Sequence, residues 1–330
     1  MVLLLAIYFI IGLGGASLVA LRGCSWGFID MPSDRSSHQA PIPKAGGIGI
    51  LLVFLISAVC CHIPLALWIP ALVISLVSLL GDYRDVSFRI RLVVQVVAAS
   101  IVSGSLFFKL SIAEMSVSSS FLLFIFGVLY ISATANYYNF MDGINGIAGV
   151  TGAIAFICLG IYGFIDKKEV AIISVAFGIA AACLGFLPLN FPKARVFMGD
   201  VGSVLLGFLF ASLALWQSRS INEFIFLSSL IYPIYLDEIS TLIIRIRDRD
   251  RLTNAHRRHI YQILANQAGF SHLRVTIIYG AIQIIIIFLV WSLKEKSTIY
   301  LISLLAVLST IFFIIGLHIR RRWEGFANGA

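Results

Sequence analysis

The sequence predicts an all-α, polytopic integral membrane protein with about eleven transmembrane helices. Hydrophobic residues make up 60% of the 330 residues and charged residues only 12%, whereas charged residues are about a quarter of an ordinary soluble domain. The mean hydropathy is +0.99. The apolar residues also gather into runs close to the roughly 20 residues that a helix needs to cross the hydrocarbon layer. Together these observations exclude a soluble fold.

Eleven apolar runs follow one another along the chain. The only sizeable polar segment is 245–272, and no internal repeat is visible. We therefore expect a single transmembrane domain over 1–330, with a cytoplasmic loop at 245–272. The eleven runs are 2–21, 46–61, 64–80, 91–109, 121–136, 146–164, 170–187, 202–217, 224–244, 273–292 and 298–318.

The first run reads as the first transmembrane helix. It lacks the basic leading residues and the small-residue cleavage site of a secretory signal. Most of the cysteines lie inside apolar runs and none is spaced for metal binding, so we expect small packing residues and no disulfide framework. The five cysteines are Cys24, Cys60, Cys61, Cys158 and Cys183.

The basic residues predict the orientation in the membrane. With eleven crossings, the first, third and every second later loop share one side with the C-terminus. Of the 24 Lys and Arg residues, 18 lie in these loops or within two residues of them. Basic loops stay in the cytoplasm, so the N-terminus is expected outside and every motif below in the cytoplasm. The net charge of +8 is therefore a topology signal, and we expect no nucleic-acid partner.

A polar stretch, Asn136 to Gly146, interrupts this apolar chain. Its members Asn136, Asn139, Asp142 and Asn145 recur every three residues, which stacks their side chains on one face of a helical turn or tight loop. A carboxylate and three amides at the mouth of two apolar segments indicate a cation or nucleotide site at the membrane surface. The alternative is a solvated loop between helices.

The stretch Phe197 to Ser203 opens the eighth run with a Gly-Asp-x-Gly-Ser pattern. Asp200 is placed either to cap this helix or to hold a divalent cation together with Asn139 or Asp142. Magnesium is held by one or two carboxylates, with phosphates and water completing its shell. Phe197 is placed either to stack on a base or simply to pack.

Two further segments carry charge. Asp82 and Asp85 end the third run and are followed by arginines, which predicts either a nucleophile-assisting carboxylate beside phosphate-binding arginines or a charged surface loop. In the long loop, His256 and His259 lie one helical turn apart among many arginines. Such a group suits phosphate, and imidazoles also suit metal; a basic loop beside a bilayer also attracts anionic lipid.

The loop after the first run contributes Lys44, a candidate contact for a phosphate or a lipid headgroup, just before Gly46 and Gly47. In the ninth run, Asp237 and Glu238 follow Pro233. Ionisable residues at that depth face protein or water and indicate function, unless the proline bends the helix so that its second half already stands in the cytoplasm.

Together these motifs resemble the polyprenyl-phosphate N-acetylhexosamine-1-phosphate transferases, most closely the O-antigen-type branch of glycosyltransferase family 4. The resemblance covers the chain from Asp30 to about His272, in the family's order. Its most specific parts are 136–146, 197–203 and 256–262, the last followed by 269–272.

The resemblance implies a reaction and a set of partners. N-acetylhexosamine 1-phosphate would pass from a UDP-sugar to undecaprenyl phosphate with release of UMP, at the inner face of a bacterial cytoplasmic membrane, to begin a surface polysaccharide such as O-antigen. The cofactor would be Mg²⁺, with Mn²⁺ as an alternative. Membrane lipids are further expected partners, and an oligomer is compatible with the sequence.

The resemblance also implies roles for single residues. Asn139 and Asp200 would hold the metal ion, and Asp142 would orient the metal site or the lipid phosphate. Phe197 and Asn145 would bind uracil. The remaining contacts to phosphate, sugar and lipid would come from Lys44, Asp85, Asn136, His256, Arg257, Arg258 and His259.

The sequence departs from the family pattern at two positions. The family commonly has adjacent aspartates after the third run, but Arg84 precedes Asp85 here, so the first carboxylate is missing unless Asp82 replaces it. Asn145 stands where a second aspartate is common, and an amide still pairs with uracil. A dedicated base is not essential, because a phosphate monoester is already mostly dianionic near neutral pH (second pKa about 6).

Two other functions were weighed. A transporter or lipid flippase would favour charged residues deep within several helices and paired broken helices, whereas most acidic residues here lie at the ends of runs. The missing aspartate raises the second alternative, a homologue without activity. The sequence does not choose between UDP-linked N-acetylglucosamine, N-acetylgalactosamine and a 6-deoxy sugar.

Overall fold

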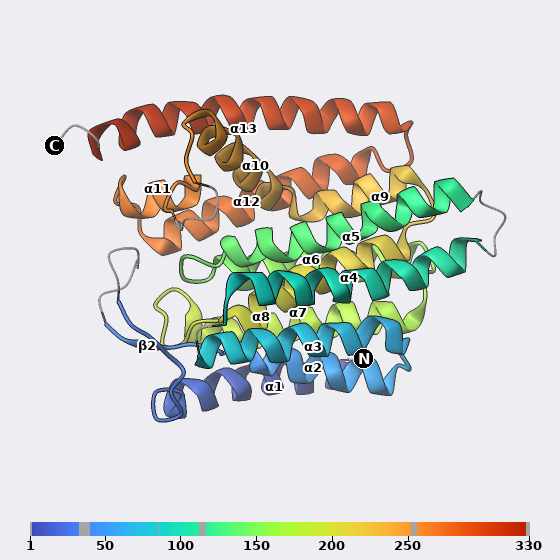
Figure 1. Ribbon diagram of the computed structural model, residues 1–330, viewed down its shortest axis with the longest axis horizontal. Coiled ribbons are helices and arrows are strands. Elements are labelled where there is room, and N and C mark those ends of the chain that lie inside the picture. The colour runs from blue at the N-terminus through green and yellow to red at the C-terminus, as the bar shows by residue number, and fades with distance from the viewer. Residues whose placement is uncertain (1, 33–39, 85, 112–116, 252–255, 328–330) are drawn as a thin grey trace.

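Long helices lying alongside one another make up the protein (Figure 1). The computed structural model describes residues 2–32, 40–84, 86–111, 117–251 and 256–327. The all-α prediction is confirmed. The described elements are α1 (Val2–Arg22), β1 (Ile29–Asp30), β2 (Ile42–Pro43), α2 (Ile48–Cys60), α3 (Leu65–Tyr83), α4 (Phe88–Ser111), α5 (Val117–Phe140), α6 (Ile147–Ile165), α7 (Val170–Asn190), α8 (Asp200–Gln217), α9 (Ile221–Ser228), the 3₁₀ helix η1 (Ser229–Ile231), α10 (Tyr232–Arg247), α11 (Ile260–Asn266), α12 (His272–Ser292) and α13 (Thr298–Ala327).

Within the described residues, ten helical segments are long and apolar enough to cross a membrane, with α9, η1 and α10 counted as one. Each coincides with a predicted run. The second run differs, because its helix α2 has only 13 residues. At 1.5 Å per residue it is about 20 Å long, short of the roughly 30 Å of a hydrocarbon layer. The chain is thus a multi-pass membrane protein with ten candidate spans among the described residues, one fewer than predicted, because α2 is too short to count as the eleventh.

The loop before α2 is bonded to the loop before α8. Gly46 N donates to Phe197 O and Gly47 N donates to Met198 O, both at 2.8 Å, while Phe197 N donates to Pro43 O at 2.8 Å. The backbone of 43–47 therefore finds its partners in the loop before α8. This pairing satisfies the backbone groups within the protein, since an unpaired N–H or C=O buried away from water costs about as much as a lost hydrogen bond.

The first turns of α2 and α8 touch through their backbones. A Cβ on Gly47 would lie 2.4 Å from the Cα of Gly202. Only glycine permits this approach, and it brings 43–47 directly against the start of α8.

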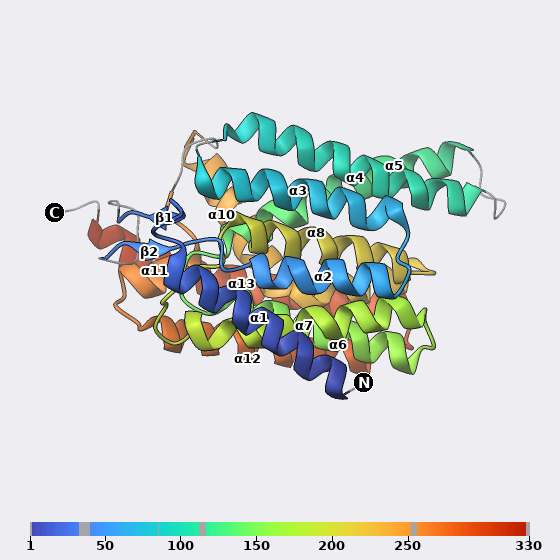
Figure 2. The same cartoon turned by 90° about the horizontal axis from the view of Figure 1, so that it is seen from below.

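Helix α8 lies in the interior, with α2 and α3 on one side of it (Figure 2). It packs against α3 and α5, and 83% of its residues are buried, compared with 11% in the most apolar 18-residue window of α13. A helix apolar on all sides belongs inside a bundle or in lipid. Helix α8 is therefore the protein-covered centre, and α13 faces lipid.

The ninth run is broken. Helix α9 ends at Ser228, three residues of 3₁₀ helix follow, and α10 starts again with Pro233 at its second position. Proline fits the first turn of a helix because no N–H is needed there. The break turns α10 away from the line of α9 (Figure 1).

The bundle has two unlike ends (Figure 1). Helix α11, the β1–β2 pair and the C-terminal end of α13 gather at one of them, and α1 begins at the other. We call the first the site end and the second the opposite end. Opposite placement of the first and last helix ends agrees with an odd number of crossings.

Candidate active site

A carboxylate from α3 bonds the first N–H groups of α8. Asp82 Oδ1 accepts from Asp200 N and Asp82 Oδ2 accepts from Val201 N, both at 3.1 Å. The side chain of Asp82 is buried, with 4% of the residue exposed. A helix N-terminus carries unpaired N–H groups and partial positive charge, so a carboxylate is stabilising there. Asp82, not Asp200, is therefore the cap of α8, and the Asp200 carboxylate remains available for other contacts.

Gly199 makes this arrangement possible. Its φ is +74°, and a Cβ there would lie 2.6 Å from Ala45 N and 2.6 Å from Asp82 Oδ2. A side chain at this position would push apart the loop at residue 45 and the capping carboxylate. The Gly-Asp pattern thus has a backbone role at Gly199 and a side-chain role at Asp200.

The Asp200 carboxylate lies between an amide and a cation. Asn139 Nδ2, from the last turn of α5, donates to Asp200 Oδ1 at 2.8 Å and also to Ser203 Oγ at 2.8 Å. Arg91 Nη1, from the first turn of α4, bonds Asp200 Oδ2. Three helices therefore converge on one carboxylate. The pairing of Asn139 with Asp200, on which the sequence-based hypothesis depends, is present.

Asp142 follows in the turn after α5, where its backbone N donates to Asn139 O at 3.1 Å. Enclosure by the protein, together with the nearby carboxylates of Asp200 and Asp82, raises the pKa of Asp142 well above its usual value. Three acidic groups close enough to disfavour one another's charge mark a place where a cation is favourable.

The two other amides of the polar stretch point elsewhere. Asn136 Nδ2 donates to Gln95 Oε1 at 2.6 Å, which ties α5 to α4. Asn145 Nδ2 donates to Pro192 O at 3.2 Å, and its backbone N bonds His272 Nδ1 at 3.3 Å. The structure thus brings Asn139 and Asp142 to Asp200, while Asn136 lies one turn earlier on α5 and Asn145 lies in the turn before α6.

Lys44 and Phe197 come together through the loop pairing described above. Lys44 N donates to Phe28 O at 3.1 Å, and the charge of Lys44 interacts with the Asp82 carboxylate. Phe197 is half-buried, and its backbone bonds Pro43 and Gly46 on either side of Lys44. These two predicted substrate-binding residues therefore lie on paired loops beside the start of α8.

The histidine segment is built on Asp237. This residue is fully buried and bonds the first N–H groups of α11: Asp237 Oδ1 accepts from Ile260 N at 2.8 Å and Asp237 Oδ2 from Tyr261 N at 3.2 Å. Tyr279 OH donates to Asp237 Oδ2 at 2.5 Å. Asp237 therefore faces protein and holds α11, just as Asp82 holds α8.

His256 and His259 lie with their ring centres 4.8 Å apart. His259 is buried, and its Nδ1 lies 3.5 Å from Glu238 Oε1 and 3.7 Å from Asp237 Oδ1. Burial, then the neighbouring His259 and Arg245, lower the pKa of His256 to about 4. His256 is therefore neutral near pH 7 and offers a lone pair as well as an N–H.

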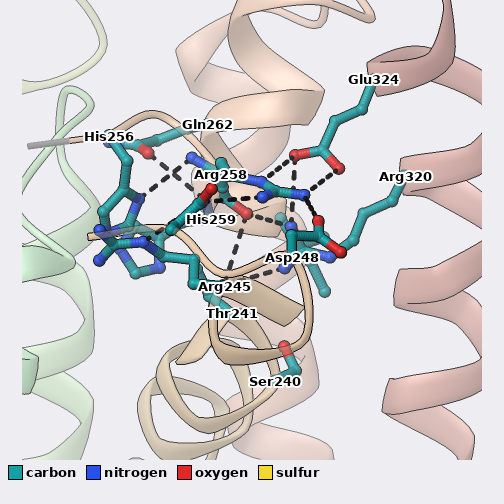
Figure 3. Close-up of polar contacts among 12 residues, drawn as sticks. Ser240, Thr241, Arg245, Asp248, His256, Arg258, His259, Gln262, Arg320 and Glu324 are labelled. Carbon is teal, nitrogen blue, oxygen red and sulfur yellow. Dashed lines mark hydrogen bonds and ion pairs between the residues drawn. The ribbon is translucent and has the colours of Figure 1, made fainter. Parts of the chain in front are cut away.

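Arg258 is held by three carboxylates (Figure 3). Its guanidinium bonds Asp248 at 2.6 Å, Asp250 at 2.9 Å and Glu324 at 3.2 Å. The predicted role of Arg258 in binding phosphate stays a prediction, and in this structure its side chain ties the loop to α10 and α13. Arg257 is half-buried on the same segment.

Tyr261 joins the two groups. Its backbone N is held by Asp237, and its hydroxyl donates to Phe140 O, at the end of α5, at 2.7 Å. Burial, then the carboxylates of Glu238, Asp237 and Asp142, raise the pKa of the Tyr261 hydroxyl well above its usual value. The histidine segment and the polar turn after α5 are therefore parts of one site at the site end of the bundle.

Asp85, predicted to lie beside the attacking phosphate, is outside the described residues. The neighbouring Asp82 does not replace the missing carboxylate freely, because each of its oxygens accepts a backbone bond.

Three contributors were not foreseen. Arg91 was counted among arginines near phosphate, not as the partner of Asp200. Tyr261 lay inside a quoted motif without a role, and Asn190 was not singled out, although its Oδ1 accepts from Gly146 N at 2.7 Å. Arg91 and Asn190 are polar residues at the ends of apolar runs, and this position in the sequence could have identified both as candidates.

The Asp200 carboxylate is the kind of oxygen ligand that magnesium prefers, and in this structure its two oxygens accept from Asn139 Nδ2 and Arg91 Nη1. No group of three or more His, Cys, Asp or Glu side chains arranged for a metal ion occurs within the described parts of the chain. Asp200 with Asn139 gives one carboxylate and one amide, and Mg²⁺ is commonly bound by one or two carboxylates while substrate phosphates and water supply the rest. The residues therefore fit a metal that arrives with, or is completed by, a phosphorylated substrate.

Comparison with known proteins gives consistent matches. The model of glycosyl transferase family 4 matches residues 64–218, from the start of α3 to just past the end of α8. A protein of Bacillus subtilis (strain 168), described as a probable undecaprenyl-phosphate N-acetylglucosaminyl 1-phosphate transferase, is 28% identical over 304 residues, covering 87% of this chain and 83% of that protein.

Two further relatives span most of both chains. The undecaprenyl-phosphate alpha-N-acetylglucosaminyl 1-phosphate transferase of Salmonella typhi is 27% identical, covering 90% of this chain and 85% of its own. The decaprenyl-phosphate N-acetylglucosaminephosphotransferase of Mycobacterium leprae is 28% identical, covering 82% and 77%.

Fold, site and relatives together define a multi-pass membrane phosphotransferase with its polar groups at one end of a helix bundle. Residues 64–218 match glycosyl transferase family 4, and the relatives are named as polyprenyl-phosphate N-acetylglucosamine-1-phosphate transferases, which confirms the resemblance found in the sequence.

Proposed function

We propose that this protein transfers an N-acetylhexosamine 1-phosphate from a UDP-sugar to undecaprenyl phosphate and releases UMP. The observation that carries the proposal is the contact of Asn139 with Asp200 at 2.8 Å, made between α5 and α8 beside the enclosed carboxyl of Asp142. The names of the relatives support a polyprenyl phosphate as acceptor. The branch that the motifs resemble favours the first step of a surface polysaccharide such as O-antigen.

Asp200 and Asn139 would hold Mg²⁺, or Mn²⁺ in its place. When bound, the ion would neutralise charge on the pyrophosphate and on the departing UMP. Arg91 already places a positive charge on Asp200, and a guanidinium also suits phosphate oxygens. We assign Arg91 to the phosphates once the cation engages Asp200.

The remaining residues would bind and orient the two substrates. Phe197 and Asn145 are assigned to uracil. Lys44 and Asn136 are assigned to other substrate contacts near the start of α8. His256, His259, Arg257 and Arg258 are assigned to the phosphates and sugar, and Asp85 to the attacking lipid phosphate. A phosphate already carrying two negative charges needs no strong base, so holding the reactants in line is the main requirement.

We place the site end in the cytoplasm and the N-terminus outside. The uneven distribution of Lys and Arg supports this orientation, as does the source of the donor, because a soluble nucleotide sugar is made in the cytosol. The lipid phosphate then approaches from the inner leaflet of a bacterial cytoplasmic membrane.

Transfer of radiolabelled sugar phosphate to undecaprenyl phosphate tests the function. Purified protein with Mg²⁺ and a panel of UDP-sugars should give a labelled lipid and UMP in equal amounts, and the panel identifies the sugar. A transporter or an inactive homologue would form neither product.

The variant Asp200→Asn tests the metal assignment. It keeps the size of the side chain but removes the charge, so we expect transfer to fall by about a hundredfold or more, with a melting temperature close to that of the wild type. Near-normal turnover of Asp200→Asn would remove Asp200 from the metal site.

A further inference from the structure

One charged side chain of α13 is buried although most of this helix faces lipid. Arg320 lies near the C-terminal end of α13, at the site end of the bundle (Figure 1), and is only 5% exposed. Burying a charged group costs free energy unless the group is paired and hydrogen-bonded. The partners of Arg320 therefore indicate what this residue does.

Both terminal nitrogens of the Arg320 guanidinium are bonded to the candidate active site or its support (Figure 3). Arg320 Nη1 donates to the backbone oxygen of Arg258, and Arg320 Nη2 donates to Thr241 Oγ1 at 2.9 Å. Thr241, on α10, also lies 3.4 Å from Arg258 O and 3.3 Å from Asp237 Oδ1. Arg320 therefore links α13 to α10 and to the backbone directly before His259.

The neighbours of Arg320 on α13 contact the same region. Glu324, one turn later, lies 3.6 Å from Arg320 Nη1 and accepts from Arg258 Nε at 3.2 Å. One turn earlier, a Cβ on Gly316 would lie 2.6 Å from Ile260 Cδ1, so α13 packs closely on the first residue of α11. Residues four apart share one face of a helix. This face of α13 therefore holds the chain that leads into α11.

We infer that Arg320 is a positioning residue of the candidate active site. By bonding Arg258 O and Thr241, it fixes the backbone that carries His256 and His259, so that both imidazoles stay in the site. The inference rests on the proposed function, in which these two histidines bind the phosphates and sugar of the UDP-sugar. Arg320 acts through the backbone, because its terminal nitrogens are already bonded to protein.

The transfer kinetics of Arg320→Gln test this role. Glutamine has no charge and is shorter, so it cannot reach both acceptors. We expect KM for the UDP-sugar to rise about tenfold, because displaced groups bind the donor less well, while KM for undecaprenyl phosphate stays within about twofold of the wild type. A protein that is merely less stable has fewer active molecules, which lowers the measured kcat and leaves both KM values unchanged.

Two variants serve as controls. Arg321→Gln removes the same charge from the next residue of α13, whose side chain is exposed, and should keep both KM values of the wild type. Arg320→Lys keeps the charge but offers one nitrogen instead of two. Its KM for the UDP-sugar should lie between the values of the wild type and Arg320→Gln.

A second measurement does not depend on sugar transfer. Diethyl pyrocarbonate modifies accessible neutral imidazoles, and mass spectrometry identifies the modified residues. His259 is 3% exposed and should react slowly in the wild type and in Arg321→Gln. In Arg320→Gln it should react about fivefold faster, because a bond that holds the segment is lost. The exposed His62, at the opposite end, should react equally in all variants.

An unchanged KM for the UDP-sugar in Arg320→Gln, or an unchanged reaction of His259, would overturn the inference. Equal changes in Arg321→Gln would overturn it as well, since any loss of positive charge would then suffice. If the wild type itself transfers no sugar phosphate, the proposed function fails, and the reaction of His259 still decides whether Arg320 holds the segment.

Discussion

Asp82 and Asp237 have the same structural role at two places in the site. Each is a buried carboxylate that accepts two backbone N–H bonds from the first turn of another helix, Asp82 on α8 and Asp237 on α11. Neither role is local, since each partner lies far along the chain. One carboxylate therefore fixes the start of α8, the helix that begins with Asp200. Another fixes the start of α11, the helix that follows His259.

The lowered pKa of His256 predicts a pH dependence of stability. In the unfolded chain this imidazole binds a proton as the pH falls through about 6.5, but in the folded protein only near pH 4. Between these values the unfolded state binds more protons, so the folded state loses stability as the pH falls from about 6.5 toward about 4.

The variant His256→Gln removes this contribution. Its melting temperature in detergent should decline less steeply than that of the wild type between pH 6.5 and pH 4, and the two proteins should share the same slope from pH 7 to pH 8. Parallel curves over the acidic interval would show that His256 is protonated equally in both states.

At the scale of elements, the short helix α11 depends on its cap. In Asp237→Asn one of the two accepting oxygens becomes an amide nitrogen, which cannot accept, so a backbone N–H at the start of α11 loses its partner. We expect a loss of about 1–3 kcal/mol in unfolding free energy and faster hydrogen exchange over 256–266, with reduced transfer.

The adjacent Glu238→Gln is the matched control. Glu238 is also buried, but its Oε1 has no hydrogen-bond partner among the described residues, and it lies 3.5 Å from the His259 ring without bonding a backbone N–H of α11. Its exchange rates over 256–266 should stay near those of the wild type. Equal loosening in both variants would mean that the general loss of negative charge, and not the cap, controls α11.

The contact between α2 and α8 predicts a glycine requirement. In Gly47→Ala the added methyl would lie 2.4 Å from the Cα of Gly202, so the two backbones must separate at a cost of about 1–3 kcal/mol. Because this separation also shifts the start of α8, we expect lower thermal stability together with lower transfer.

Gly14→Ala provides the comparison for this variant. Gly14 lies inside α1, and a Cβ there meets nothing within 4 Å. Alanine favours a helix over glycine by about 1 kcal/mol, so Gly14→Ala should leave the melting temperature unchanged or raised. A loss of stability as large as that of Gly47→Ala would contradict the close-packing argument.

At the scale of the whole molecule, the proposed orientation is open to direct test. Lys193 is exposed in the loop before α8 and Lys296 is exposed after α12, at opposite ends. In a chain with its own cysteines replaced, Lys296→Cys should react with a membrane-impermeant maleimide in intact spheroplasts. Lys193→Cys should react only after lysis. The reverse pattern would place the site end outside.

The sequence was sufficient for the order of the long helices, because apolar runs of about 20 residues have one main physical explanation, but it predicted eleven spanning helices where the described residues contain ten. It also identified Asn139 and Asp200 through their patterns. It did not reveal the cap on α8, the pairing of 43–47 with 197–198 or the contact of Arg91 with Asp200, because each joins residues distant in the chain.

The pairing of 43–47 with the loop before α8 has a consequence for biosynthesis. The backbone of this early segment finds its hydrogen-bond partners about 150 residues later in the chain. While the ribosome is still making the intervening helices, those N–H and C=O groups have no protein partner, and α2 alone is too short to cross the membrane. These hydrogen bonds can therefore form only after the chain has been made as far as Met198, so the start of α2 reaches its final position late in synthesis.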